Sequence, residues 1–146
     1  MNPFLDAANW AAGCTCLARR DPVLAGLIAA YGDERLEPHG DVFSTLMRAV
    51  TGQQISVLAA ERIWQRLLAR LGRPSPDAVL SAGEEALAAC GLTRRKAASL
   101  VAIAGGLATG AALPDSRDAL LALPGVGPWT ADMVAIFALG EGDIMP

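Results

Sequence analysis

A nine-residue string near the end of the chain restricts the fold more than any other feature. Residues 123–131 read LPGVGPWTA, and they lie between a short helical pattern at residues 115–122 and a longer one that follows. Gly125 and Gly127 can adopt backbone angles that are closed to other residues, and Pro128 suits the first turn of a helix. The string therefore predicts two helices joined by a tight glycine turn.

Two interpretations of this turn follow from its residues. The amide groups at the start of the second helix point outward, so the turn can hold a phosphate oxygen through backbone donors and the positive helix end. The string also fits a plain pair of packed helices, in which Gly125 and Gly127 only allow a close crossing. The nine residues alone leave both interpretations open.

The composition favours helices throughout. The chain has 146 residues, enough for one domain with a real core, and 53% of them are hydrophobic while 5% are aromatic. Alanine and leucine dominate, which favours helix over strand, and no alternating strand pattern is present. We therefore expect an all-α fold, a single compact multi-helix domain over residues 1–146 that contains the two helices joined by the glycine turn.

Capping residues mark where the helices begin. Asp21, Asp41, Ser75 and Thr93 each stand immediately before an apolar helical pattern, as N-caps do. Core positions expected in the first two helices are Phe4, Leu5, Ala8, Leu17, Leu24, Leu27 and Ile28. The helices are expected at about residues 1–20, 22–31, 42–50, 56–71, 76–80, 82–89, 94–107, 115–122 and 128–139.

Charge and cysteine content limit the function. A net charge of −3 and a pI of about 5.0 argue against a strongly electrostatic nucleic-acid binder. The basic cluster at residues 94–96 reads as a solvated helix surface unless it lies beside the glycine turn. Cys14, Cys16 and Cys90 are expected to be reduced, mostly buried thiols, which form neither a zinc site nor an iron–sulfur cluster.

The sequence also bears on location. No apolar run reaches the ~18 residues of a membrane span, and the N-terminus lacks a signal pattern. We therefore expect a cytoplasmic protein that does not enter a membrane.

His39 stands in a polar loop without an acid or nucleophile nearby, and we expect it at the surface.

Four segments in a fixed order carry a resemblance to a known family. They are residues 21–28 (DPVLAGLI), 43–56 (FSTLMRAVTGQQIS), 90–97 (CGLTRRKA) and the string at 123–131. The chain resembles DNA glycosylases of the helix-hairpin-helix superfamily, in their 3-methyladenine glycosylase II branch. The likeness covers nearly the whole chain from Asp21 onward, and the hairpin is its most specific piece.

This resemblance implies a base-excision repair enzyme of the bacterial cytosol, associated with the nucleoid. It would be a monomer that flips an alkylated base out of double-stranded DNA and hydrolyses the N-glycosidic bond. The amides around Gly125, Val126 and Gly127 would hold the DNA backbone, with a Na or K ion at Leu123 and Val126 and no other cofactor. Such phosphate contacts position a protein but carry no sequence information.

The resemblance also assigns residues to the flipped base. Gln53 and Gln54 stand where relatives insert a side chain into the hole that the base leaves; Gln54 is preferred, and a shift of one residue would select Gln53. Trp129 matches a pocket position, where its ring suits stacking on a cationic alkylated base. The alternatives are a satisfied turn for the glutamines and a core position for Trp129, and Trp64 is expected in the core.

A catalytic aspartate is implied as well, to stabilise positive charge on the sugar and to orient water. The family pattern places it after the loop at residues 140–146, beyond Pro146, so no residue is assigned as catalytic. We expect the chain to be incomplete at its C-terminus, with apolar surface on the last helix that is either exposed or covered by a partner. Asp132 is interpreted as favouring the start of its helix, and Asp143 is the only substitute for the aspartate.

Two other functions fit the same residues. One is a DNA-binding helix-hairpin-helix module without catalysis, for which the phosphate turn and the missing aspartate would be the signature. The other is a helical interaction domain that binds no nucleic acid, which the net charge of −3 supports.

Overall fold

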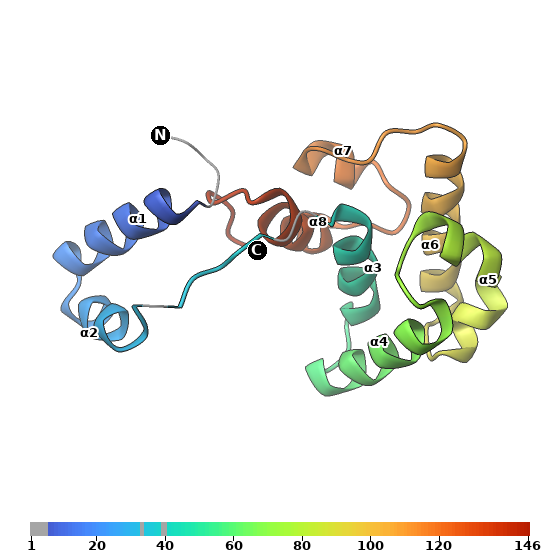
Figure 1. Cartoon of the computed structure of the whole chain (residues 1–146), viewed down its shortest axis with the longest axis horizontal. Helices are drawn as coiled ribbons and strands as arrows, with labels where there is room; N and C mark the ends of the chain where they lie inside the picture. Colours follow the sequence, from blue (N-terminus) through green and yellow to red (C-terminus); the bar gives the residue numbers. More distant parts are fainter. Residues whose placement is uncertain (1–5, 33, 39–40) are drawn as a thin grey trace.

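The computed structural model describes residues 6–32, 34–38 and 41–146, which are helical and contain no β-strand (Figure 1). This confirms the all-α prediction. The expected surface position of His39 and the expected core positions of Phe4 and Leu5 lie outside the described residues. The helices are α1 (Ala7–Arg20), α2 (Pro22–Tyr31), α3 (Val42–Gly52), α4 (Val57–Leu71), α5 (Pro76–Ala89), α6 (Arg94–Ala108), α7 (Arg117–Leu121), α8 (Pro128–Val134) and the π-helix η1 (Ala135–Leu139).

Side-chain caps begin the helices where the sequence predicted them. Asp21, Asp41, Ser75 and Thr93 each accept a hydrogen bond from a backbone N–H two or three residues further on. Two short helices were expected within residues 76–89, and α5 indeed contains a break at Gly83, whose φ of 74° is not helical.

The core is built around α3, which packs against α4, α6, α8 and η1 (Figure 1). Its buried residues are Phe43, Thr45, Leu46, Met47, Val50 and Thr51. The inner face of α6 is formed by Ala97, Leu100, Ile103 and Ala104, all of which are buried. Because α3 packs against both α6 and α8, its C-terminal end brings the turn that follows it close to these two helices.

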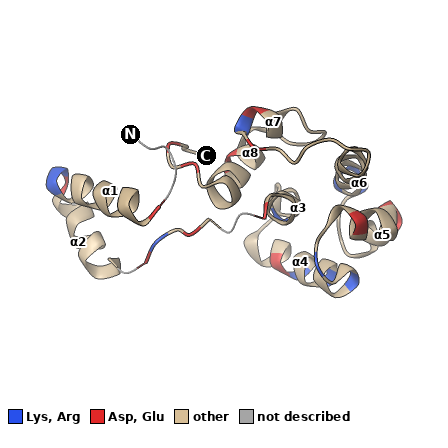
Figure 2. Cartoon of the chain, turned by 45° about the horizontal axis from the view of Figure 1, so that its top comes forward, with Lys and Arg blue, Asp and Glu red and all other residues tan. Residues whose placement is uncertain are grey.

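The first two helices differ from the prediction. α1 and α2 pack chiefly on each other, to one side of the body formed by α3 to η1 (Figures 1 and 2). Neither helix contains a buried residue, so Leu17 and Leu27, expected in the core, are 48% and 51% exposed. The apolar stripe at Leu24 and Ile28 is half-buried, because a single neighbouring helix covers only part of it.

The last helix also differs from the prediction. Instead of one α-helix to Leu139, α8 ends at Val134 and continues as the wider turns of η1. Gly140 ends it in the left-handed conformation, with a φ of 76°.

The cysteine prediction was partly wrong. The three thiols are free, but Cys90 alone is buried, while Cys14 is half-buried and Cys16 is exposed. The two N-terminal thiols lie on α1, which the body does not cover.

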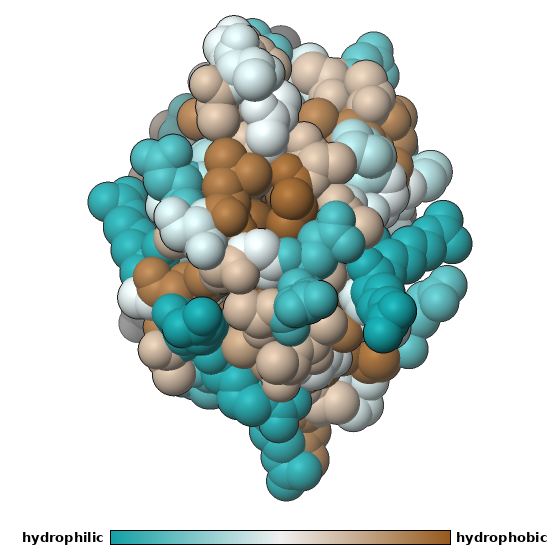
Figure 3. Space-filling view, turned by 90° about the vertical axis from the view of Figure 1, so that its right-hand side faces the viewer, coloured by the Kyte–Doolittle hydropathy of each residue, from teal (hydrophilic) through white to brown (hydrophobic). Residues whose placement is uncertain are grey.

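No helix in the described part of the chain is both long and apolar enough to cross a membrane. On the side of the body that carries α5 and α6, hydrophilic and hydrophobic residues are interspersed (Figure 3).

Candidate nucleic-acid interface

The glycine turn between α7 and α8 is held against α6. Gly125 has a φ of 77°, and a Cβ at this position would meet the Ser99 side chain of α6, whose own Cβ would be 3.0 Å away. Gly127 is the N-cap of α8, has extended backbone angles and makes no side-chain cap, and a Cβ there would point into open space. The first glycine therefore allows packing, while the second leaves the outer side of the turn bare.

The amides of this turn are not equivalent. The Val126 N–H donates to the Leu123 carbonyl oxygen at 3.3 Å, and the Val126 side chain is buried. Among the described residues, no hydrogen bond is made by the N–H groups of Gly125 and Gly127. Of the three residues predicted to bind the DNA backbone, these two glycines therefore retain available donors, whereas the Val126 amide is used within the turn.

The turn after α3 is tied to the glycine turn through Gln53. The Gln53 side-chain amide donates to the Gly125 carbonyl oxygen at 3.2 Å and to the Thr130 hydroxyl at 2.8 Å. Gln54 has no such tie, is exposed, and has a φ of 55°, which is uncommon for a residue with a side chain. The two glutamines thus differ: Gln53 joins two segments 72 residues apart, and Gln54 projects from the turn that Gln53 fixes.

Lys96 fixes the same turn from the other side. Its ammonium group donates to the carbonyl oxygens of Thr51 at 2.9 Å and Gln53 at 2.8 Å, at the C-terminal end of α3. A cation is favoured there because the last carbonyls of a helix lack partners. The basic cluster at residues 94–96 therefore lies beside the glycine turn, but its lysine is a structural cap, while Arg94 and Arg95 are exposed.

Titration of Lys96 checks this contact, since it is the only lysine of the chain. Burial lowers the pKa of its ammonium group from the ordinary value of 10.5. Between the lowered pKa and 10.5 the unfolded chain binds more protons, so the free energy of unfolding should rise with pH in that window. We expect its side-chain NMR signal to titrate below 10.5 in native protein and near 10.5 in urea. Equal values in both states would contradict the buried contact.

A cavity of about 680 Å³ opens beside these turns. Its walls come from α3, the turn at Ile55, α4, α8 and η1, and Trp64 and Trp129 both line it. Trp129 is 48% exposed, so it is a wall of this cavity and not a core residue, whereas Trp64 is buried as predicted. The remaining lining residues are Asp41, Ser44, Thr45, Arg48, Ala49, Gly52, Val57, Ala60, Glu61, Met133 and Phe137.

Asp132 has a different role from the one the sequence predicted. It is the fifth residue of α8, beyond the first turn, and it is 6% exposed. Its carboxylate accepts a hydrogen bond from Arg117 Nε at 2.5 Å, which links α7 to α8. The hydrogen bond to Asp132 raises the pKa of the Arg117 guanidinium. Asp143, the other carboxylate considered, is exposed in the final loop.

Replacing Arg117 with glutamine is expected to lower the melting temperature by roughly 5 °C, because the buried Asp132 carboxylate loses its charged partner. Changing both partners, Arg117→Met with Asp132→Leu, should recover most of the loss, since neither charge is then left alone. Thermal unfolding followed by circular dichroism measures both. Equal losses in the single and double variants would mean that the pair does not act as a unit.

A family model for the HhH-GPD superfamily of base excision DNA repair proteins matches residues 47–141. The chain belongs to this superfamily. The matched region runs from within α3 to the residue after Gly140, and so includes both turns, Lys96 and most of the cavity wall.

Relatives of this superfamily member agree with the resemblance seen in the sequence. DNA-3-methyladenine glycosylase 1 of Schizosaccharomyces pombe is 31% identical over 137 residues, which cover 84% of this chain and 60% of that protein. A probable bifunctional transcriptional activator/DNA repair enzyme AlkA of Mycobacterium tuberculosis is 30% identical over 143 residues, 86% of this chain and 29% of that protein. The chain therefore spans about 60% or less of the length of these relatives.

Solved structures give the same picture. The 3-methyladenine DNA-glycosylase of Archaeoglobus fulgidus superposes with a TM-score of 0.70 at 28% identity, over 94% of this chain and 59% of that one. The S. pombe glycosylase Mag1, solved in complex with abasic DNA, gives 0.65 at 30% identity, over 77% and 64%. The expected kinship with 3-methyladenine glycosylases is confirmed.

Sequence reasoning missed several residues of the site. Arg48 and Glu61, which line the cavity as an ion pair, were not singled out. Gln53 and the cluster containing Lys96 were considered, but not the contacts through which they fix the turn after α3. The position of Trp64 on the inner stripe of α4 was the one available signal for Arg48, because the Arg48 guanidinium of α3 lies over the Trp64 ring. No local pattern indicated that Gln53 bonds to residues more than 70 positions away.

Proposed function

We propose that this chain forms the DNA-holding turn and the base pocket of a monomeric glycosylase that removes alkylated bases from double-stranded DNA. Support comes first from the superfamily and from relatives named as 3-methyladenine glycosylases. The observation that carries the proposal is the cavity with two tryptophans beside the turn of Gln54 and the glycine turn. Its volume of about 680 Å³ falls in the usual range for small-molecule sites.

The DNA backbone is held by the glycine turn in this proposal. The amides of Gly125 and Gly127 donate to phosphate oxygens, and the open space over Gly127 lets the strand approach. A Na or K ion at the carbonyls of Leu123 and Val126 would add charge to this contact, although the Leu123 oxygen already accepts the Val126 amide. Because these contacts come from uncharged backbone amides, they neutralise few phosphates, and binding is expected to depend only moderately on salt.

Gln54 fills the gap left by the flipped base. Its positive φ and its exposure support this role, because strained exposed residues concentrate at functional turns. Gln53 positions Gln54 relative to the hairpin, and Lys96 holds the backbone of the same turn. Gln54 and the glycine turn then move as one unit when DNA binds.

The extruded base stacks in the cavity against Trp129. A half-exposed indole offers an electron-rich face to an alkylated base, an interaction worth about 1 kcal/mol or more when water is excluded. Bases that carry a positive charge leave the sugar readily, so the pocket has to contribute less to breaking the N-glycosidic bond. Two carboxylates on α8 and α4 are already paired, Asp132 with Arg117 and Glu61 with Arg48.

Binding and base release test the proposal separately. We expect the chain to bind a duplex with a tetrahydrofuran abasic-site analogue more tightly than the undamaged duplex, measured by fluorescence anisotropy at low salt. Absence of duplex binding would overturn the proposal and favour an interaction domain without nucleic acid. Release of 3-methyladenine from methylated DNA would show that a carboxylate within the 146 residues suffices for hydrolysis. Binding without release would favour the non-catalytic DNA-binding module.

A further inference from the structure

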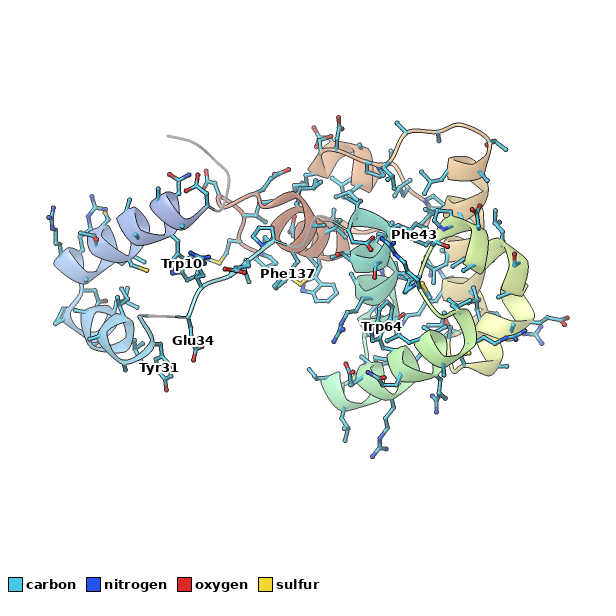
Figure 4. All side chains as sticks on the ribbon, in the orientation of Figure 1. Trp10, Tyr31, Glu34, Phe43, Trp64 and Phe137 are labelled. Atoms are coloured by element: carbon cyan, nitrogen blue, oxygen red, sulfur yellow. The ribbon has the colours of Figure 1, made fainter. Side chains whose placement is uncertain are left out.

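One wall of the cavity already contains a cation. The guanidinium of Arg48 lies over the ring of Trp64, with its central carbon 5.5 Å from the ring centroid. Arg48 also forms an ion pair with Glu61 at 2.9 Å, and Glu61 accepts a second hydrogen bond from Gln65 at 2.7 Å. Trp64 projects from α4 toward α3, where Arg48 lies (Figure 4). Arg48, Glu61 and Trp64 all line the cavity.

These groups differ in how firmly they are held. Trp64 is 5% exposed and forms a fixed wall. The side chains of Arg48 and Glu61 are 60% and 44% exposed, so they stand at the mouth of the cavity. Exposed ion pairs of this kind contribute little to stability, so Arg48 can move without loss of the fold.

The position of Arg48 matters for the charge of a base that enters. A cationic alkylated base would compete with the guanidinium for the face of Trp64 and would be repelled by it. A neutral purine meets no such repulsion, and its N7 and O6 atoms can accept hydrogen bonds from a guanidinium. A base methylated at N7 has lost the first of these acceptors.

We propose that Arg48 sets the charge selectivity of the cavity, lowering its preference for cationic alkylated bases and thereby admitting neutral purines whose N7 and O6 atoms accept hydrogen bonds from the guanidinium. This inference rests on the proposed function of the cavity as a base pocket. Glu61 acts in the opposite sense, because its carboxylate neutralises Arg48 and attracts a cationic base. Arg48 is thus a residue that determines specificity, and it has no part in breaking the glycosidic bond.

Free nucleosides test the inference without DNA and without catalysis. The indole N–H signals of Trp64 and Trp129 in ¹H–¹⁵N spectra report binding of 7-methylguanosine, which is cationic in mildly acidic buffer, and of inosine, which is neutral there. For Arg48→Met we expect 7-methylguanosine to bind about fivefold more tightly and inosine to bind equally or more weakly. Glu61→Gln should shift the ratio the other way. Arg48→Lys keeps the charge and should change the ratio least.

A matched control is Arg62→Met, which removes one charge from the exposed side of α4 outside the cavity lining. It should leave the ratio unchanged. Equal effects of Arg48→Met on both nucleosides, or no shift of either indole with any nucleoside, would overturn the inference. Binding of the abasic-site duplex is measured in parallel, and its absence would count against the proposed function, whereas the nucleoside ratio alone decides the role of Arg48.

Discussion

Replacement of Gly125 with alanine is expected to weaken binding of the abasic-site duplex by roughly 30-fold, corresponding to about 2 kcal/mol of phosphate hydrogen bonding. The φ of 77° is unfavourable for alanine, and the new Cβ would meet Ser99. Either α6 and the hairpin separate or the turn changes shape, and both move the Gly125 and Gly127 amides. The free energy of unfolding should fall by about 2 kcal/mol, measured by urea denaturation.

Two companion variants separate packing from DNA contact. Ser99→Gly in the Gly125→Ala background removes the contact but leaves the backbone angle, so it should restore only part of the stability. Gly127→Ala places a Cβ in open space at extended backbone angles, so the fold should be unaffected. A loss of duplex binding in Gly127→Ala would then report close approach of DNA. Normal duplex binding by Gly125→Ala would contradict the role given to the turn.

The helices were predictable because their signals are local. The side chains of Asp41 and Thr93 accept hydrogen bonds from amides three residues further on, so both partners of each contact lie close together in the sequence. The burial of α3 and α6 followed from the helical spacing of their apolar residues. The same reasoning failed for α1 and α2, since an apolar stripe shows that a helix can be covered but not how much covers it.

The candidate site was predictable only in part. The glycine turn and Trp129 stand in one short string, and the structure brings that string to the rim of a cavity. The contacts that position the site join distant segments: Lys96 reaches the end of α3, and Gln53 reaches the hairpin. Such contacts depend on how helices pack, which a single sequence does not encode in any local pattern. The pairing of Asp132 with Arg117 belongs to the same class.

Replacement of Trp129 with alanine is expected to reduce the preference for an alkylated base about tenfold while leaving the fold intact. The side chain is 48% exposed, so its loss removes little packing, and a base stacked on an aromatic ring contributes about 1–3 kcal/mol. The measurement compares binding of a duplex with one 7-methylguanine, on a 2′-fluorinated sugar that resists hydrolysis, with binding of the abasic-site duplex. Trp129→Phe keeps a ring and should retain part of the preference.

The abasic-site duplex distinguishes this effect from that of the hairpin. It offers no base to the cavity, so Trp129→Ala should bind it as the wild type does, whereas Gly125→Ala should bind both duplexes weakly. Equal losses on both duplexes in Trp129→Ala would mean that the indole contacts the DNA backbone and not the base. Trp64 cannot serve for this comparison, because it is 5% exposed and its truncation to alanine removes about 3–5 kcal/mol of stability. Stacking in the cavity is therefore tested at Trp129, while its preference for charge is tested at Arg48.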